Sequence, residues 1–241
     1  MSSPSPLSTN HGLTLRQASL VAGIAYFLMP VAIAEFYIKP KLIIPGDIER
    51  TSQNIASHGQ LFAAAILCYL VTYILDIVIA WALYVLLVPV NRSLSLLTAW
   101  FRLIYAALAI LPLSNLLTVY RVLHSPVYLP VFGAGPLHAQ VLLLLNSYNY
   151  GWGLFIFGIH LGLLGYLIYR SGYIPKLLGV LLVLDGFVWV VNSMQPYFYP
   201  NARLGFLFAV SFTELLLPLW LLVRGWRLNE NDLRSSPSQK I

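Results

Sequence analysis

The feature that most constrains this sequence is a series of apolar runs, several of them longer than the roughly 20 residues that an α-helix needs to cross about 30 Å of hydrocarbon. The apolar residues form continuous runs rather than the periodic stripes of half-buried helices. Of the 241 residues, 59% are apolar and only 9% are charged, whereas a soluble domain carries roughly 25% charged residues. Water is therefore not the main solvent of this chain.

The runs predict an all-α integral membrane protein, a bundle of six transmembrane helices joined by short loops. We expect one membrane domain over residues 14–226, a disordered tail at 1–13 and a second, cytoplasmic one at 227–241. The expected helices are 14–38, 58–88, 93–121, 137–169, 175–195 and 203–224. The fourth would be about 50 Å long, so we expect it to project outward or to break near Asn149-Tyr150-Gly151.

The first apolar run contains Ala32-Ile33-Ala34, which imitates a signal-peptide cleavage site. The run continues almost to Ile38, however, and this length suits a membrane span. We therefore expect the first helix to be retained, with cleavage as the alternative.

Basic residues predict the orientation, because loops rich in Lys and Arg remain in the cytoplasm. With the N-terminus inside, eight basic residues fall on the cytoplasmic side and five outside, so both termini are expected in the cytoplasm. The formal net charge of +6 lies at the ends of apolar runs and indicates headgroup contacts rather than a nucleic-acid partner. The single cysteine, Cys68, excludes an intrachain disulfide and a Cys-based metal site.

Five ionisable side chains lie deep inside the predicted spans, far from the helix ends, where each costs at least about 2.5 to 3.5 kcal/mol on insertion scales. Counted at 1.5 Å per residue from the cytoplasmic helix ends, all five lie roughly 14 to 18 Å deep. They come from five different helices and are Asp76, Arg102, His160, Asp185 and Glu214. A common depth on five helices predicts a shared polar centre inside the bundle.

Three acids in this centre face one Arg and one His. At least one carboxyl should therefore hold a proton or recruit a cation, because burial and neighbouring like charges both oppose ionisation. We expect Arg102 to be the fixed counter-charge, paired with Glu214 or Asp76, and Glu214 to be the exchangeable acid. The structural alternatives are a hydrogen-bonded core histidine at His160 and an interfacial residue at Glu35.

Polar side chains also extend from the centre toward the outside. Asn149 shares a helical face with His160, and Asn192 lies seven residues after Asp185. We expect a vestibule lined by Asn149, Trp189, Asn192 and Gln195.

Two further patterns predict local structure. Gly158, Gly162 and Gly165 share one helical face and indicate close packing of two helix backbones. Pro45-Gly46 predicts a turn, and Asp47 can cap a helix after it. That helix is either amphipathic and interfacial or part of a solvated outer loop.

The order of motifs resembles an uncharacterised bacterial membrane family, domain of unknown function 4386, over about residues 14–226. The matching stretches are Arg16-Gln17-Ala18, Leu42-Ile43-Ile44-Pro45-Gly46-Asp47, Thr51, Asn54-Ile55, Leu83-Tyr84, Pro89-Val90-Asn91-Arg92, Phe101-Arg102-Leu103, Phe157-Gly158-Ile159-His160, Gly165-Tyr166-Leu167-Ile168, Ser171-Gly172-Tyr173-Ile174-Pro175, Leu178-Gly179-Val180-Leu181-Leu182, Glu214-Leu215 and Leu219-Trp220-Leu221-Leu222. The resemblance implies six helices in a bacterial inner membrane and supplies no substrate, cofactor or activity. It places Arg102, His160 and Glu214 on typical family positions, and Asp185 where small or apolar residues are usual.

The leading functional hypothesis is a small transporter or permease-like protein whose midplane carboxyls bind a proton or cation and couple it to movement of a small solute. The first alternative is a lipid-active intramembrane enzyme, with His160 and Asp185 or Glu214 as acid and base or as metal ligands. The second is a nonenzymatic membrane partner or sensor. The sequence favours a non-enzyme without cofactor or metal, because one intramembrane histidine is a thin ligand set. The structure at mid-depth would separate the three hypotheses. A transporter requires a cavity lined by the acids, an enzyme requires a compact His-carboxylate set that holds a metal, and a partner or sensor requires no cavity.

Overall fold

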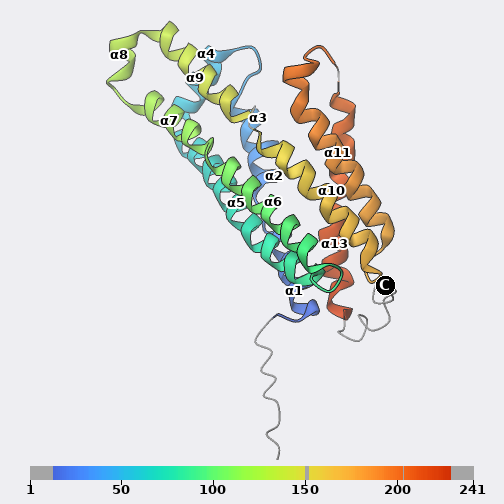
Figure 1. Ribbon diagram of the computed structural model, residues 1–241. Helices are drawn as coiled ribbons and strands as arrows, with labels where there is room; N and C mark the ends of the chain where they lie inside the picture. The colour runs from blue at the N-terminus through green and yellow to red at the C-terminus, as the bar shows by residue number, and fades with distance from the viewer. Residues whose placement is uncertain (1–12, 150–151, 203, 229–241) are drawn as a thin grey trace, which may run out of the picture.

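The computed structural model describes residues 13–149, 152–202 and 204–228. Throughout this part the chain consists of helices, turns and short connections, without strands (Figure 1). The predicted tails at 1–13 and 227–241 fall almost entirely outside the described residues.

The first half of the chain runs through α1 (Leu15–Phe27), α2 (Val31–Ile33), a π-helical turn (Ala34–Ile38), α3 (Lys39–Leu42), α4 (Ile48–Ser57), α5 (Gly59–Leu87) and α6 (Arg92–Ile110). The second half runs through α7 (Leu113–His124), α8 (Tyr128–Phe132), α9 (Ala134–Asn149), α10 (Gly153–Ser171), α11 (Lys176–Phe198), α12 (Phe208–Ser211) and α13 (Leu216–Val223). Single 3₁₀ turns occupy Gly205–Leu207, Phe212–Leu215 and Gly225–Arg227.

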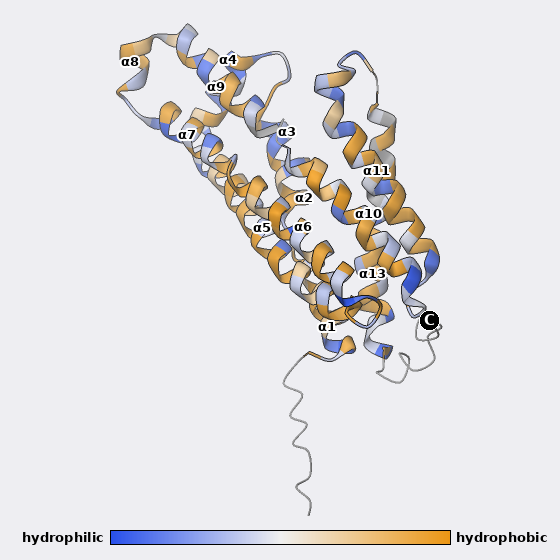
Figure 2. Ribbon diagram, viewed as in Figure 1, coloured by the Kyte–Doolittle hydropathy of each residue, from blue (hydrophilic) through white to orange (hydrophobic). Residues whose placement is uncertain are grey.

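Five segments of the described chain are long and apolar enough to cross a membrane: Leu15–Leu42, Gly59–Leu87, Arg92–His124, Gly153–Ser171 and Lys176–Phe198. Apolar residues cover these helices along most of their length (Figure 2). The sixth expected span, 203–224, is divided into α12, α13 and 3₁₀ turns instead of forming one continuous helix. This segment packs against α1 and α11. It therefore belongs to the bundle, although it is not one of the five continuous candidate spans.

Prolines account for two differences from the predicted helices. The first predicted helix stops at Phe27 and resumes at Val31, on either side of Pro30. The predicted helix 93–121 is divided into α6 and α7 at Pro112, because proline lacks the N–H that a continuous helix needs. The expected break in 137–169 coincides with the boundary between α9 and α10, although residues 150–151 lie outside the described part.

The hairpin of α10 and α11 is held together by facing glycines. A Cβ atom at Gly165 would lie 2.5 Å from the carbonyl oxygen of Gly179, and one at Gly158 would lie 2.6 Å from that of Gly186. The predicted glycine face is therefore the place where the two backbones meet. Gly162, on the same predicted face, has open space around its Cβ position and does not require glycine.

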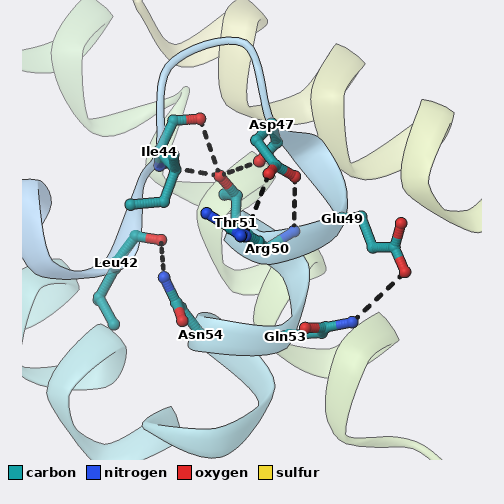
Figure 3. Close-up of polar contacts among 8 residues, drawn as sticks. All are labelled: Leu42, Ile44, Asp47, Glu49, Arg50, Thr51, Gln53 and Asn54. Carbon is teal, nitrogen blue, oxygen red and sulfur yellow. Dashed lines mark hydrogen bonds and ion pairs between the residues drawn. The ribbon is translucent and has the colours of Figure 1, made fainter.

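The turn between α3 and α4 is closed by the polar residues of the Pro45-Gly46 motif (Figure 3). Asp47 accepts a hydrogen bond from the backbone N–H of Arg50 at 2.9 Å and so caps α4, as the sequence predicts. The Thr51 hydroxyl accepts from the Ile44 N–H at 2.9 Å and donates to the Asp47 carbonyl at 2.8 Å. The motif is therefore explained by the local structure of the turn.

The buried face of α4 packs against α7 and α9. Ile55 on this face is fully buried and belongs to an apolar core with α5, α7 and α9. The helix is thus part of a folded outer lobe. The amphipathic helix leading into α5, one of the two alternatives predicted from the sequence, is therefore confirmed, and the solvated loop is wrong. Its place at a membrane interface stays a prediction.

A second apolar core joins α1, α5, α10, α11 and α13 at the opposite end of the bundle. Here the Tyr173 hydroxyl, in the connection between α10 and α11, donates a hydrogen bond to the Leu86 carbonyl at 2.6 Å. Burial raises the pKa of the Tyr173 phenol, so it remains a donor. This bond ties the α10–α11 hairpin to the end of α5.

We expect Gly165→Ala to lower the thermal stability of the purified protein. The added methyl group would overlap the Gly179 carbonyl, and overpacking of this kind costs about 1 to 3 kcal/mol. Gly162→Ala is the matched control on the same helix and should leave the melting temperature unchanged or slightly raised. Equal melting temperatures for the two variants would contradict the assignment of the interface.

Candidate functional site

The centre of the bundle is organised around the guanidinium of Arg102, on α6. Its Nε and Nη2 donate to Asp76 Oδ1, on α5, at 2.9 and 2.5 Å. Its Nη1 donates to the Tyr26 hydroxyl, on α1, at 2.6 Å and to His160 Nε2, on α10, at 3.2 Å. One buried cation therefore joins four helices.

His160 holds a defined tautomer in this network. The Arg102 guanidinium can only donate, so His160 Nε2 must accept. His160 Nδ1 lies 2.9 Å from the Thr98 carbonyl, which can only accept, so Nδ1 carries the proton. His160 is therefore a neutral ring with both nitrogens engaged, and neither is free to act as a base or as a metal ligand.

A cavity of about 500 Å³ begins at the Arg102–Asp76 pair and continues outward between the helices. At its outer end lies a second ion pair, in which Lys39 Nζ contacts Glu35 Oε2 at 2.9 Å. The Tyr69 hydroxyl also donates to Glu35, at 2.7 Å. Both members of the outer pair are about one-third exposed, so the cavity extends from the buried centre to the protein surface.

Several of the points at which helices are interrupted lie along the cavity. Met29 and Val31 line it beside Pro30, and Pro112 lines it at the junction of α6 and α7. Gly153, at the start of α10, and Glu214, in the 3₁₀ turn before α13, complete this set. The interruptions at Pro30 and Pro112 look scattered in the sequence but converge in space. Irregular backbone within a membrane is tolerated where it is buried in protein or lines a cavity.

The charged residues that line the cavity do not balance. Glu35, Asp76 and Glu214 face only Lys39 and Arg102, so one negative charge remains when all five are ionised. Asp76 and Glu35 each contact a basic partner. Glu214 forms no hydrogen bond or ion pair within the described residues, and its Oε2 is buried. The surplus charge is therefore located on Glu214.

Aromatic rings form a continuous wall along the cavity. Tyr73 contacts Tyr105 edge-on at 6.2 Å, Tyr105 contacts Phe157 at 4.7 Å, and Phe157 contacts Trp189 edge-on at 6.2 Å between ring centroids. All four residues line the cavity. Of these four residues, the sequence predicts only Trp189, as part of a polar vestibule, and not the other three. A signal was present, because Tyr69, Thr72, Tyr73 and Asp76 recur at helical spacing.

Asp185, the fifth residue of the predicted centre, lies behind the cavity wall. It is fully buried, and neither carboxylate oxygen has a hydrogen-bond partner within the described part of the chain. The side chain of Ser211, which does line the cavity, faces it from α12. Asp185 is also within electrostatic reach of Glu214. The structure therefore brings Asp76, Arg102 and His160 into contact, with Glu214 on the same cavity and Asp185 one layer away.

The residues of the predicted vestibule are not all found on this cavity. Trp189 lines the cavity, but Asn192 and Gln195 are not among its lining residues. The Gln195 amide instead donates to the Ala202 carbonyl at 2.9 Å and so fixes the connection that follows α11. The side chain of Asn149 lies outside the described residues. Toward its outer end the cavity is instead lined by α2, the π-helical turn and α5.

Comparisons with known proteins identify the family of this chain. The family model described as Domain of unknown function (DUF4386) matches residues 21–225. The chain belongs to this family. An uncharacterized protein of Archaeoglobus fulgidus is 31% identical to this chain over 160 residues, which cover 65% of this chain and 81% of that protein. No solved structure matches this chain.

We expect Arg102→Leu to destabilise this DUF4386 protein by about 3 to 5 kcal/mol, because Asp76 would be left as an unpaired buried charge. The double variant Asp76→Leu/Arg102→Leu removes both charges and should recover most of the loss. Thermal unfolding in detergent measures both. Lys39→Leu, which breaks the partly exposed outer pair, should cost at most about 1 kcal/mol. A double variant no more stable than Arg102→Leu alone would contradict the pairing.

Proposed function

We propose that this DUF4386 protein is a small transporter or permease-like protein, in which Glu214 binds a proton or cation at mid-depth and couples it to the movement of a small solute. The observation that carries the proposal is the cavity with one unbalanced acid. Its volume falls in the range of small-molecule sites, about 300 to 1,000 Å³. A bundle that served only as a scaffold would have no need of an uncompensated acid beside a cavity of this size.

The enzyme hypothesis lacks support from the site. Within the described residues, no group of three or more His, Cys, Asp and Glu side chains could hold a metal ion. His160 contacts Arg102 and the Thr98 carbonyl. It forms no hydrogen bond with Asp185 or Glu214, the two acids considered as its partners. The acid-base pairing considered from the sequence is therefore not formed.

The two ion pairs and Glu214 have different roles in the proposal. Arg102 is always protonated and is held by Asp76, so it serves as a fixed counter-charge. Glu214 has no fixed partner and can exchange a proton for a cation. Asp185 lies behind the wall, within electrostatic reach of Glu214.

The proposal includes six crossings, with both termini in the cytoplasm of a bacterial inner membrane. The basic-residue bias supports this orientation, and the segment of α12 and α13 would provide the sixth crossing. Reporter fusions at Asn10 and Asn231 test it. Reporters in opposite compartments would require an odd number of spans.

We expect Glu214→Gln to fold, because glutamine imitates the protonated acid, and to lose the pH response of the cavity. Infrared spectroscopy of the protein in lipid nanodiscs should show a protonated carboxyl band that appears as the pH falls in the parent. The band should be missing from Glu214→Gln and retained in Glu49→Gln, which removes an exposed acid on α4.

Vesicle assays complete this test, because Glu214→Gln should also lose pH-dependent uptake of any transported solute. A band that persists in Glu214→Gln would contradict the role of Glu214 and favour a purely structural account of the buried charges.

A further inference from the structure

We propose that the solute bound in the cavity is an amphipathic organic ammonium ion, with its cationic group beside Glu214 and its apolar part against the aromatic wall. This inference rests on the proposed function of the cavity and specifies the class of ligand. Its charge, its size and its apolar part each follow from a separate observation.

The sign of the ligand's charge follows from the unbalanced acid. Arg102 is neutralised by Asp76 at 2.5 Å, and Lys39 by Glu35 at 2.9 Å. Among the charged residues that line the cavity, Glu214 alone lacks a partner within the described part of the chain. An anionic ligand would place a second negative charge beside Glu214, whereas a monovalent cation would neutralise the cavity.

The cavity favours an organic cation over a bare metal ion. Alkali and alkaline-earth ions need several oxygen ligands at short range. On the segment that carries Glu214, the cavity is lined by one further oxygen-bearing side chain, that of Ser211, and much of the remaining lining is aromatic or aliphatic. Tyr105, Phe157 and Trp189 line the cavity and contact one another through their rings. Aromatic rings attract ammonium groups through their π faces, and this is how proteins recognise quaternary ammonium ligands.

The same chemistry is already present at the floor of the cavity. The Arg102 guanidinium lies 4.8 Å from the ring centroid of Tyr26 and 5.7 Å from that of Phe157. These rings are therefore arranged to stabilise positive charge within the bundle. A ligand ammonium above them would meet the same ring wall, with Glu214 as its counter-ion.

The outer end of the cavity suits an amphipathic ligand. Phe36 lines the cavity but is 62% exposed, and it lies close to the Glu35–Lys39 pair. Apolar and charged groups thus meet at one mouth, as they do at a membrane interface. A molecule with an ammonium group and an apolar body concentrates in that layer, so it would reach this mouth from the membrane surface.

Benzyltrimethylammonium is a suitable probe because its charge is permanent and does not change with pH. Neopentylbenzene is its neutral isostere, in which carbon replaces nitrogen, and benzenesulfonate is an anionic aromatic of similar size. Binding of each to the full-length protein in nanodiscs is measured by calorimetry and by the shift in melting temperature. We expect the cation to bind at least about tenfold more tightly than the neutral isostere, a difference of about 1.4 kcal/mol, and the anion not to bind.

Variants locate the site. Glu214→Gln should remove the preference for the cation over the neutral isostere, and Trp189→Leu should weaken cation binding while Glu214 remains in place. The matched control is Trp81→Leu, because Trp81 is 52% exposed on α5 and does not line the cavity; its affinity should equal that of the parent. If Glu214→Gln does not fold, the difference in cation affinity between Trp189→Leu and Trp81→Leu still tests whether the cation binds in the cavity.

Equal binding of the cation and the neutral isostere, or tighter binding of the anion, would overturn the ligand class. So would a loss of affinity in Trp81→Leu as large as in Trp189→Leu. The infrared band of Glu214 is independent of these titrations. A parent protein that shows the band but does not prefer the cation would refute the ammonium ligand alone, and one without the band would refute the exchangeable acid.

Discussion

The ion pair between Arg102 and Asp76 is the constraint on which the rest of the structure depends. A charge in hydrocarbon is tolerated only when it is paired and hydrogen-bonded, and Arg102 satisfies this condition with groups from α1, α5, α6 and α10. These helices must therefore meet at one depth and in one register. Because a buried pair contributes little net stability compared with apolar packing, its main effect is to specify this arrangement.

The cavity forms because the helices pack differently on its two sides beyond the Arg102–Asp76 pair. On one side, α10 and α11 approach until their glycines meet, which makes a close-packed hairpin. On the other, Pro30 and Pro112 interrupt the helices, and the Pro45-Gly46 turn directs the chain into a separate outer lobe packed on α7 and α9. At the outer end, α11 stands apart from the lobe of α7, α8 and α9 (Figure 1). The cavity is lined by interrupted backbone and by Glu214, which has no fixed partner.

The sequence predicted the helical membrane architecture because a chain with several long apolar runs can adopt few other folds. It also identified the buried charges and the glycine face, since each breaks a strong rule of composition or packing. It did not predict the route of the cavity, which depends on how far the chain is displaced at Pro30. Nor did it predict the aromatic wall, because tyrosines inside apolar runs resemble ordinary core residues until their neighbours are known. Asn192 and Gln195 shared the face expected of a vestibule, but helical spacing alone does not identify the neighbouring helix.

The central claim is that a solute-accessible cavity, and not merely a polar core, lies above the Arg102–Asp76 pair. Labelling of single cysteines tests it most directly, after Cys68, the single cysteine of the chain, is replaced by serine. Thr72 lines the cavity, whereas Ile77, on the same helix, is 46% exposed on the outer surface of the bundle. With a membrane-impermeant thiol reagent on intact membranes, the account predicts that Thr72→Cys is modified and that Ile77→Cys, facing lipid, is not. Protection of Thr72→Cys to the same extent as Ile77→Cys would contradict it.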